Sequence, residues 1–389
     1  MANAMADGLA LAEKYYTEYG SRARELKASG KKVIGYLTAL GPVEVLTAAG
    51  VVPLRLKGDV TEPITRADAH METIVCPFIR NVFDSALKGK FGYVDGMVMP
   101  HQCDSTEKTN NEWAYNLNLP YWHFLNVPHV TDGPSLEFFK SVLGVLIKSL
   151  ERFTGRAITE QDLAAAVKAH NANRRAMRAL YDLRKADPPL ISGVEMTQVL
   201  VAAMSLPVEE STALIEGVTA EVQQRAKAGK AAGGAGARVM LIGDQIDNTS
   251  VAKIVEDAGG KLVMDYLSIG SKVYFTDAAE NGDPVGAIAE RYLRKIKIPT
   301  THIVSEGQTY EQNLEARFGH LKGYIKDFGV NAVILFIYKY CDPYGFEVPA
   351  VKRFIEQAGA SVLYLEDEYS TSTLGRTRTR IEAFLEMIA

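Results

Sequence analysis

Hydrophobic positions along the chain fall into short continuous runs that are separated by longer amphipathic segments. These runs are typical of buried strands. They lie at 33–37, 51–56, 94–102, 121–125, 238–244, 261–265, 331–340 and 361–365. Helix-like segments come between them, such as 42–50, which has a proline early and a glycine at its end. Strands that alternate with helices predict an α/β fold built on parallel sheets.

The alternation stops in the middle of the chain and then starts again. Apolar residues have broadly helical spacing from about 135 to 228, and the Gly/Ala-rich stretch at 228–237 is typical of a linker. We therefore predict two doubly wound parallel-sheet (Rossmann-like) domains with a helical segment between them. The predicted boundaries are an N-terminal helix at 1–30, a first α/β domain at 31–134, a mostly helical segment at 135–230 and a second α/β domain at 231–389.

Composition narrows the class of protein. The 389 residues are too many for one ordinary core, and 47% hydrophobic with 23% charged residues is normal for a globular chain. The formal net charge of -4 argues against nucleic acid or an anionic membrane as the main partner. No stretch approaches ~18 consecutive apolar residues, so no membrane span is expected. The charged N-terminus lacks the apolar core of a signal peptide, which predicts a cytoplasmic protein.

The three cysteines are the most informative residues. Cys103 and Cys341 each follow a buried-type strand and each precede an aspartate, whereas Cys76 precedes Pro77 and a helix-like run. In an open parallel sheet, ligands bind in the crevice beyond the carboxyl ends of the strands. Three thiols that meet in such a crevice would favour a soft metal, because thiolates are preferred by iron–sulfur clusters, zinc and copper(I). The alternative is that they are inert buried thiols, which is the usual state of a free cysteine.

Several short motifs, taken in order, resemble one known family. They are Gly35-Tyr36, Pro42-Val43-Glu44, Ala48-Ala49-Gly50, Pro53, Cys76-Pro77, Cys103-Asp104, Cys341-Asp342-Pro343 and the helix-like 380–387. Over roughly 31–388 the chain resembles the iron–sulfur subunits of the 2-hydroxyacyl-CoA dehydratase and benzoyl-CoA reductase family. The resemblance implies that Cys76, Cys103 and Cys341 ligate one [4Fe–4S] cluster, with an open or non-cysteine fourth position.

The resemblance also implies partners. It predicts a heterodimer with a homologous iron–sulfur subunit, an acyl-CoA substrate bound near the clusters, and a separate ATP-hydrolysing iron–sulfur activator that delivers single electrons. The chain has no G-x-x-x-x-G-K-[ST] motif for ATP and no convincing G-x-G-x-x-G motif. An ATP-dependent reaction would therefore need its ATPase on another chain.

Two further residues are candidates for catalysis. Glu44 lies near a predicted strand end, from which it could handle a proton, but it is also the kind of acid that the first turn of a helix favours. His101 lies two residues before Cys103 and could donate a proton or hydrogen-bond a cluster sulfur, although a polar loop residue is the plain alternative.

Three functions follow from these features. The first is one subunit of a radical enzyme that reduces an aromatic acyl-CoA ring, of the benzoyl-CoA reductase type. The second is a subunit of a 2-hydroxyacyl-CoA dehydratase, which would remove water through a ketyl radical. The third belongs to another class: a non-catalytic α/β binding protein whose thiols are structural.

Overall fold

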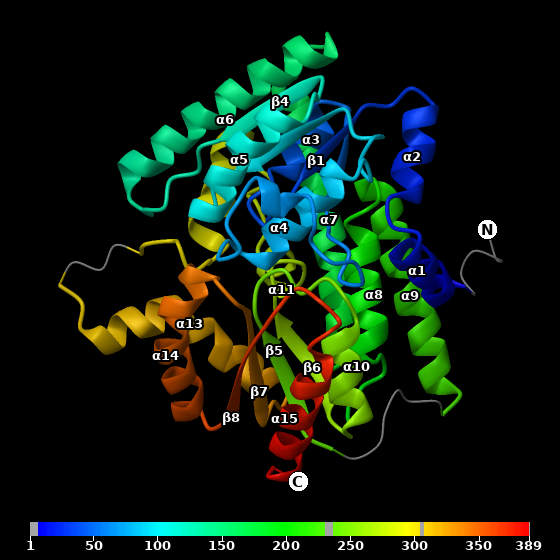
Figure 1. Cartoon of the computed structure of the whole chain (residues 1–389), viewed down its shortest axis with the longest axis vertical. Helices are drawn as coiled ribbons and strands as arrows, with labels where there is room; N and C mark the ends of the chain where they lie inside the picture. The colour runs from blue at the N-terminus through cyan, green and yellow to red at the C-terminus, as the bar shows by residue number, and fades with distance from the viewer. Residues whose placement is uncertain (1–6, 230–235, 304–306, 389) are drawn as a thin grey trace.

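Two four-stranded sheets, in both of which every strand is parallel to its neighbours, form the centre of the molecule. The computed structural model describes residues 7–229, 236–303 and 307–388. In Figure 1 one sheet lies above the other. The first consists of β1 (Val33–Tyr36), β2 (Val52–Arg55), β3 (Gly96–Pro100) and β4 (Tyr121–Leu125). The second consists of β5 (Arg238–Ile242), β6 (Lys261–Tyr266), β7 (Ala332–Tyr338) and β8 (Ser361–Asp367). The α/β fold class with two doubly wound sheets is therefore confirmed.

The two sheets have the same strand order. The first runs β2-β1-β3-β4 and the second runs β6-β5-β7-β8, so in each the first strand lies between the second and the third. In each sheet the second strand lies on one side of the first strand, and the third and fourth strands lie on the other side. The gap between the first and third strands is the topological switch point, where open α/β sheets bind their ligands.

The strands alternate with helices in both halves of the chain, as the hydrophobic pattern predicts. The first half contains α1 (Gly8–Thr17), α2 (Ser21–Ala28), α3 (Val43–Ala48), α4 (Pro77–Leu87) and α5 (Asp104–Asn116). The second half contains α10 (Ser250–Asp257), α11 (Ser271–Tyr274), α12 (Pro284–Glu290), α13 (Tyr310–Asp327), α14 (Asp342–Gln357) and α15 (Leu374–Glu386). Two short elements are helices of other types: η2 (Ala67–Ala69) is a 3-10 helix and η3 (Arg291–Lys295) is a π-helix.

The middle of the chain forms four helices that contact both sheets. They are α6 (Gly133–Thr154), α7 (Glu160–Asp182), α8 (Gly193–Ala203) and α9 (Val208–Lys227). Helix α6 packs on β4, α7 packs on α3, and α8 packs on β6 and α10. Because these helices contact elements from both halves, they bring the two sheets into one body.

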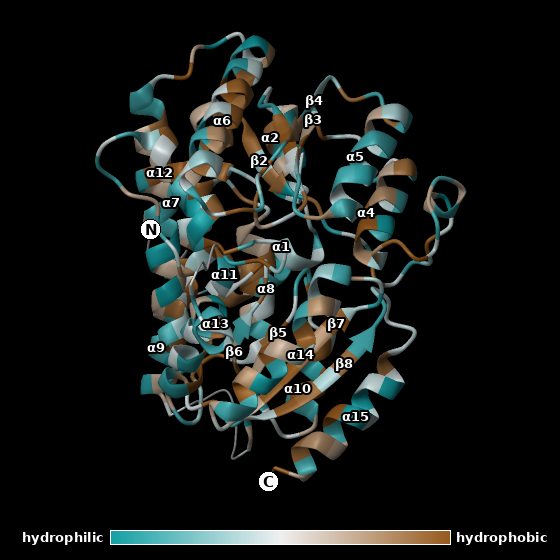
Figure 2. Cartoon of the chain, turned by 90° about the vertical axis from the view of Figure 1, so that its left-hand side faces the viewer, coloured by the Kyte–Doolittle hydropathy of each residue, from teal (hydrophilic) through white to brown (hydrophobic). Residues whose placement is uncertain are grey.

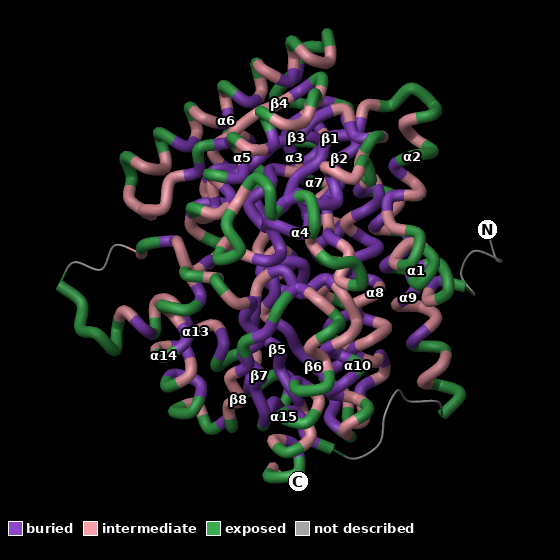
Figure 3. Tube along the Cα trace, viewed as in Figure 1, coloured by how far each residue is buried: buried purple, intermediate pink, exposed green. Residues whose placement is uncertain are grey.

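Burial follows the expected pattern. In Figure 3 the strands other than the edge strands β4 and β8 are almost entirely buried, whereas the outer helices alternate between buried and exposed positions. Figure 2 shows hydrophobic residues along β5 and β7 and hydrophilic residues along the outer helix α9. Within the described residues no helix combines the length and apolarity that crossing a bilayer would require.

One element differs from the sequence-based expectation. The described part of the N-terminal helix predicted at 1–30 is broken into α1 and α2 at Gly20, whose φ of 76° lies in the left-handed region that favours glycine. Helix α14 begins directly after Cys341 and contains Pro349. Most of the predicted linker at 228–237 lies outside the described residues.

A buried ion pair joins the two sheets. Arg55, at the end of β2, donates Nη1–H to the Asp247 carboxylate at 2.9 Å and Nη2–H to Gln245 Oε1 at 2.6 Å. Arg55 and Asp247 are only 2% and 1% exposed. Tyr369 Oη donates to the other Asp247 oxygen at 2.6 Å, and Tyr19 Oη donates to the Arg55 carbonyl oxygen at 2.5 Å. Four segments distant in sequence therefore meet around Arg55 and Asp247.

We predict that Asp247→Ala lowers the free energy of unfolding by about 3–5 kcal/mol, because it leaves the Arg55 charge buried and unpaired. Urea denaturation followed by circular dichroism measures the change. The control is Asp257→Ala, which removes exposed pairs with Lys253 and Arg378 and should cost less than about 1 kcal/mol. Equal losses in the two variants would contradict this assignment.

Candidate functional site

One cavity lies where the carboxyl ends of the two sheets meet. The space between its walls is about 1000 Å³, including the part that is open to solvent. Thr38 follows β1, Cys103 follows β3, Asp244 follows β5 and Cys341 follows β7, and all four line it. These are the first and third strands of each sheet, so the cavity occupies both switch points at once.

The structure brings the three cysteines together at this cavity. Cys76, Cys103 and Cys341 all line it, and none forms a disulfide. Each is the N-cap of a helix: Cys76 of α4, Cys103 of α5 and Cys341 of α14. A helix N-terminus presents unpaired N–H groups and the positive end of the helix dipole. Three such ends directed at one cavity favour negative charge there, including that of thiolates.

The local sequence explains why a helix begins at each cysteine. Pro77 occupies the first turn of α4, where the missing N–H of proline costs nothing. At α5 the Cys103 N–H donates to Thr106 Oγ1 at 3.0 Å, and this hydroxyl donates to the Cys103 carbonyl oxygen at 2.7 Å. Asp342 supplies an acid to the first turn of α14. Before it, Tyr340 adopts a φ of 61°, which turns the chain sharply between β7 and Cys341.

Burial makes the thiols reluctant to ionise. It raises the pKa of Cys76 to about 12, against the weaker opposing effect of the Phe78 and Ile79 N–H groups. It also raises the pKa of Cys103 and of Cys341. Repulsion from Cys103 also raises the pKa of Cys76, and repulsion from Cys76 and Cys103 raises that of Cys341. A cation in the cavity would be needed to hold all three as thiolates at neutral pH.

Polar residues that were not predicted from the sequence also line the cavity or lie behind its wall. Asp244 accepts a hydrogen bond from Gln102 Nε2 at 3.3 Å and another from the Ser268 hydroxyl. Behind it, Lys272 Nζ donates to the Gly243 carbonyl oxygen at 2.9 Å. Burial lowers the pKa of Lys272 to about 8. The signal that could have identified Asp244 is its position directly after a buried strand.

His101 lies beside the cavity, and His129 lines it. The two rings are tilted by 45° with centroids 4.6 Å apart, and His129 Nε2 lies 3.1 Å from the His101 carbonyl oxygen. Burial lowers the pKa of His129. His101 Nε2 is buried without a hydrogen-bond partner, and ligand atoms of His101, Asp104 and Glu107 all lie within 4.8 Å of one another. Of the two histidines, His129 is therefore the one in contact with the cavity that the cysteines line.

Glu44 does not face this cavity. It lies in the first turn of α3, is 0% exposed, pairs with Arg174 and accepts a hydrogen bond from Tyr292 Oη at 2.8 Å. Burial alone would raise its pKa, but Arg174 and Arg291 outweigh that effect and hold the pKa well below its usual range. A carboxylate held ionised in this way is a poor proton donor at neutral pH. Arg174 and Arg291 lie 130 and 247 residues from Glu44 in the chain, so the sequence did not reveal this pairing.

Comparison with known proteins agrees with the geometry. The family model described as 2-hydroxyglutaryl-CoA dehydratase, D-component, matches residues 38–388. That range contains all three cysteines and every strand of the two sheets except β1, which ends just before it.

Similar proteins are subunits of enzymes that act on acyl-CoA compounds. The (R)-phenyllactyl-CoA dehydratase beta subunit of Clostridium sporogenes is 24% identical over 366 residues, which cover 94% of each chain. One of the benzoyl-CoA reductase subunits of Thauera aromatica is 26% identical over 357 residues, with 88% of each chain covered. The (R)-2-hydroxyglutaryl-CoA dehydratase beta subunit of Acidaminococcus fermentans is 25% identical, covering 93% of this chain and 94% of that one.

The raised pKa of Cys76 predicts how the metal-free chain responds to pH. An unfolded thiol loses its proton near ~8.5, whereas folded Cys76 keeps it up to about 12. The unfolded state therefore binds fewer protons between these values, so the free energy of unfolding should fall as pH rises through them. Urea denaturation between pH 7.5 and 10 should show that fall, and Cys76→Ser should make it shallower. Ser105→Ala, which changes a non-titrating cavity residue, should keep the wild-type slope; an unchanged slope in Cys76→Ser would contradict the prediction.

Proposed function

The chain belongs to the 2-hydroxyglutaryl-CoA dehydratase D-component family, and from that premise we propose that it is one iron–sulfur subunit of an enzyme complex acting on acyl-CoA thioesters. The observation that carries the proposal is the arrangement of Cys76, Cys103 and Cys341 as three helix N-caps around one cavity. The rest follows from what such a cavity can hold and from what its rim can bind.

The residues of the cavity fit a [4Fe–4S] cluster. Three half-buried thiols of suitable chemistry line one cavity, and three helix N-termini favour the negative charge of thiolates and sulfides. A fourth thiolate is not available, because the chain has three cysteines only. When bound, such a cluster supplies single electrons and an iron with a position open to a non-cysteine ligand.

The chain's own residues would shape the space around that group. Phe78 and Ile79 give the cavity an apolar wall that excludes water, and Gln102 and Thr300 give it a polar one. Thr300 Oγ1 donates to the Gln102 carbonyl oxygen at 2.7 Å, which fixes the loop after β3 against the loop after η3. His129 is a titratable ring at the wall, and burial lowers its pKa, which favours the neutral ring that can accept a proton there.

A partner subunit would cover the mouth of the cavity. Phe346 and Tyr340 line the cavity and yet are 88% and 47% exposed. Ile74, two residues before Cys76, is also exposed. Exposed apolar side chains gathered at the rim of a site are typical of an interaction surface. Together with the subunit names of the relatives, they support a heterodimer with a homologous iron–sulfur subunit.

Two reactions remain candidates for the complex. Elimination of water from a 2-hydroxyacyl-CoA is supported by the family description and by the dehydratase relatives. Reduction of the benzoyl-CoA ring is supported by the similarity to a benzoyl-CoA reductase subunit. Either would draw electrons from a separate ATP-hydrolysing iron–sulfur activator. Anaerobic turnover of both substrates with partner and activator separates them, since only the dehydratase reaction proceeds without net reduction.

We predict that the protein purified without oxygen is brown and holds about four irons per chain. Cys76→Ser, Cys103→Ser and Cys341→Ser should each lose most of this iron, because each removes one thiolate of the set. Asp104→Asn is the matched control: it changes the exposed neighbour of Cys103 and should keep the iron. A colourless, iron-free wild-type protein would contradict the cluster proposal and favour structural thiols.

A second prediction concerns the partner. Phe346→Glu places a charge on the exposed rim and should weaken association with the partner subunit by at least about tenfold, since burying an unpaired charge is costly. Analytical ultracentrifugation of the co-expressed subunits measures the association. Tyr115→Glu, at a residue 90% exposed on α5, should leave it unchanged. If both variants assemble like the wild type, the rim is not the interface.

A further inference from the structure

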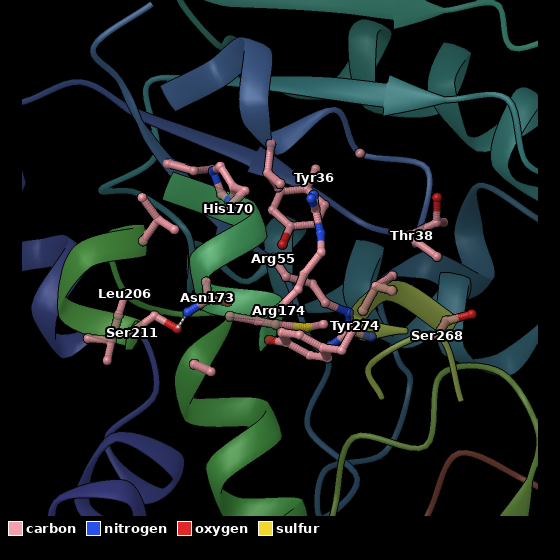
Figure 4. A pocket seen from close by; sticks show the side chains of 18 of the residues that line it. Tyr36, Thr38, Arg55, His170, Asn173, Arg174, Leu206, Ser211, Ser268 and Tyr274 are labelled. Atoms are coloured by element: carbon pink, nitrogen blue, oxygen red, sulfur yellow. Dashed lines mark hydrogen bonds between the residues drawn. The ribbon is translucent and has the colours of Figure 1, made fainter. Parts of the chain in front are cut away.

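A second cavity lies behind the first, between the first sheet and the helices of the middle segment. The space between its walls is about 680 Å³, including the part that is open to solvent, and Thr38 lines both cavities. Figure 4 shows the side chains of Tyr36, Arg55, His170, Arg174 and Tyr274 gathered around it. None of the three cysteines lines it.

The charges at this cavity do not balance. Arg174 and Arg291 line it and are 3% and 2% exposed, whereas the one carboxylate that faces both is Glu44. Arg174 pairs directly with Glu44, but Arg291 Nη1 lies 3.9 Å from the same carboxylate. Arg291 also donates to the carbonyl oxygens of Thr276 and Val273 and lies over the Tyr292 ring at 4.8 Å, and none of these groups is a carboxylate. Two buried cations thus share one anion.

The remaining titratable groups of the wall do not remove this excess. Arg55 is balanced by Asp247. His170 Nε2 shares a hydrogen bond with Thr47 Oγ1 at 2.9 Å. Burial lowers the pKa of His170 to about 4, so the ring is neutral at pH 7. Among the described residues, the cavity wall and its backing therefore carry one uncompensated positive charge. A buried charge without a counter-charge is costly, which favours an anion in the cavity.

An unpartnered donor points to the same conclusion. Arg55 uses both terminal nitrogens, but its Nε is buried without a hydrogen-bond partner. Arg55 lines the cavity and is 2% exposed. A buried N–H group without an acceptor costs free energy, which an acceptor oxygen on a ligand would recover.

The rest of the wall is apolar. Val43, Pro53, Met204, Leu206 and Val273 line the cavity beside the charged groups. A free inorganic anion would leave this surface without a partner, whereas an acid with a hydrocarbon body would use both parts of the wall. We propose that this cavity binds a small organic carboxylate, whose charge meets Arg174 and Arg291 and whose hydrocarbon part packs on the apolar wall.

The proposal goes beyond the assignment of the cysteines. It needs no cluster, so it can be tested on protein without iron, and its failure would leave the cysteine proposal intact. If both hold, an acyl chain that passes Thr38 from the first cavity would place its far end in the second. The carboxylate would then belong to the acyl group itself.

Isothermal titration of the purified full-length protein with matched acid and amide pairs tests the proposal. Hexanoate and benzoate should bind at least about tenfold more tightly than hexanamide and benzamide, because a charge-assisted hydrogen bond to arginine is stronger than a neutral one. Inorganic phosphate should compete poorly, since it lacks an apolar body. Equal binding of acid and amide, or stronger binding of phosphate, would overturn the proposal.

A charge series separates binding from folding. Glu44→Gln raises the excess positive charge and should strengthen benzoate binding. Arg174→Gln cancels the excess charge and should weaken benzoate binding. The double variant should bind benzoate about as tightly as the wild type. Arg178→Gln is the matched control, because Arg178 lies one turn further along α7, pairs with Asp277 and does not line the cavity. A purely structural role for Glu44 and Arg174 predicts weaker binding in both single variants, which would contradict the assignment. Thermal unfolding of each variant shows whether it is folded.

Discussion

The carboxyl ends of two parallel sheets face each other, and everything of interest in this molecule depends on that arrangement. In a parallel sheet all strands end at the same edge, so the residues that follow them gather there. Two such edges brought together double the number of loops around one space. The buried contact of Arg55 with Asp247 and Gln245 holds one sheet against the other, and the bond from Gln102 to Asp244 does the same at the cavity itself.

Because the two sheets have the same strand order, they contribute residues from equivalent positions to the cavity wall. Thr38 and Cys103 come from the first sheet, and Asp244 and Cys341 come from the second, each pair following the first and third strands. Neither sheet alone provides more than part of the wall. The helices α6–α9 are consequently part of the site's support, because they fix the distance between the two sheets.

The sequence was sufficient to predict the strands and the family. Buried parallel strands leave continuous apolar runs, and seven of the eight strands lie inside a run found in the sequence or exceed it by one residue, whereas β8 extends two residues further, to Asp367. The family resemblance is confirmed by the family match over residues 38–388, whereas the role of the three cysteines stays a prediction. The break at Gly20 was missed because a left-handed glycine leaves no mark on hydrophobic periodicity.

What the sequence could not provide was charge balance across long separations. Glu44 looked like a proton carrier because only its neighbours along the chain were visible, whereas Arg174 and Tyr292 lie 130 and 248 residues away. Thr38 and Asp244 carried a weaker signal, since each is merely polar and close to the end of a strand. Which of many such residues lines a cavity depends on how the two sheets are placed against each other.

The N-cap positions of the cysteines have a mechanical consequence. Helices α4 and α5 belong to the first half and α14 to the second, so one ion or cluster bound to all three thiols would join three helix starts across the gap between the sheets. Binding of that ion or cluster would then raise the stability of the folded chain, because a ligand that binds only the folded form stabilises it by mass action. Without that group, the two halves would separate more readily along this line than anywhere within either sheet.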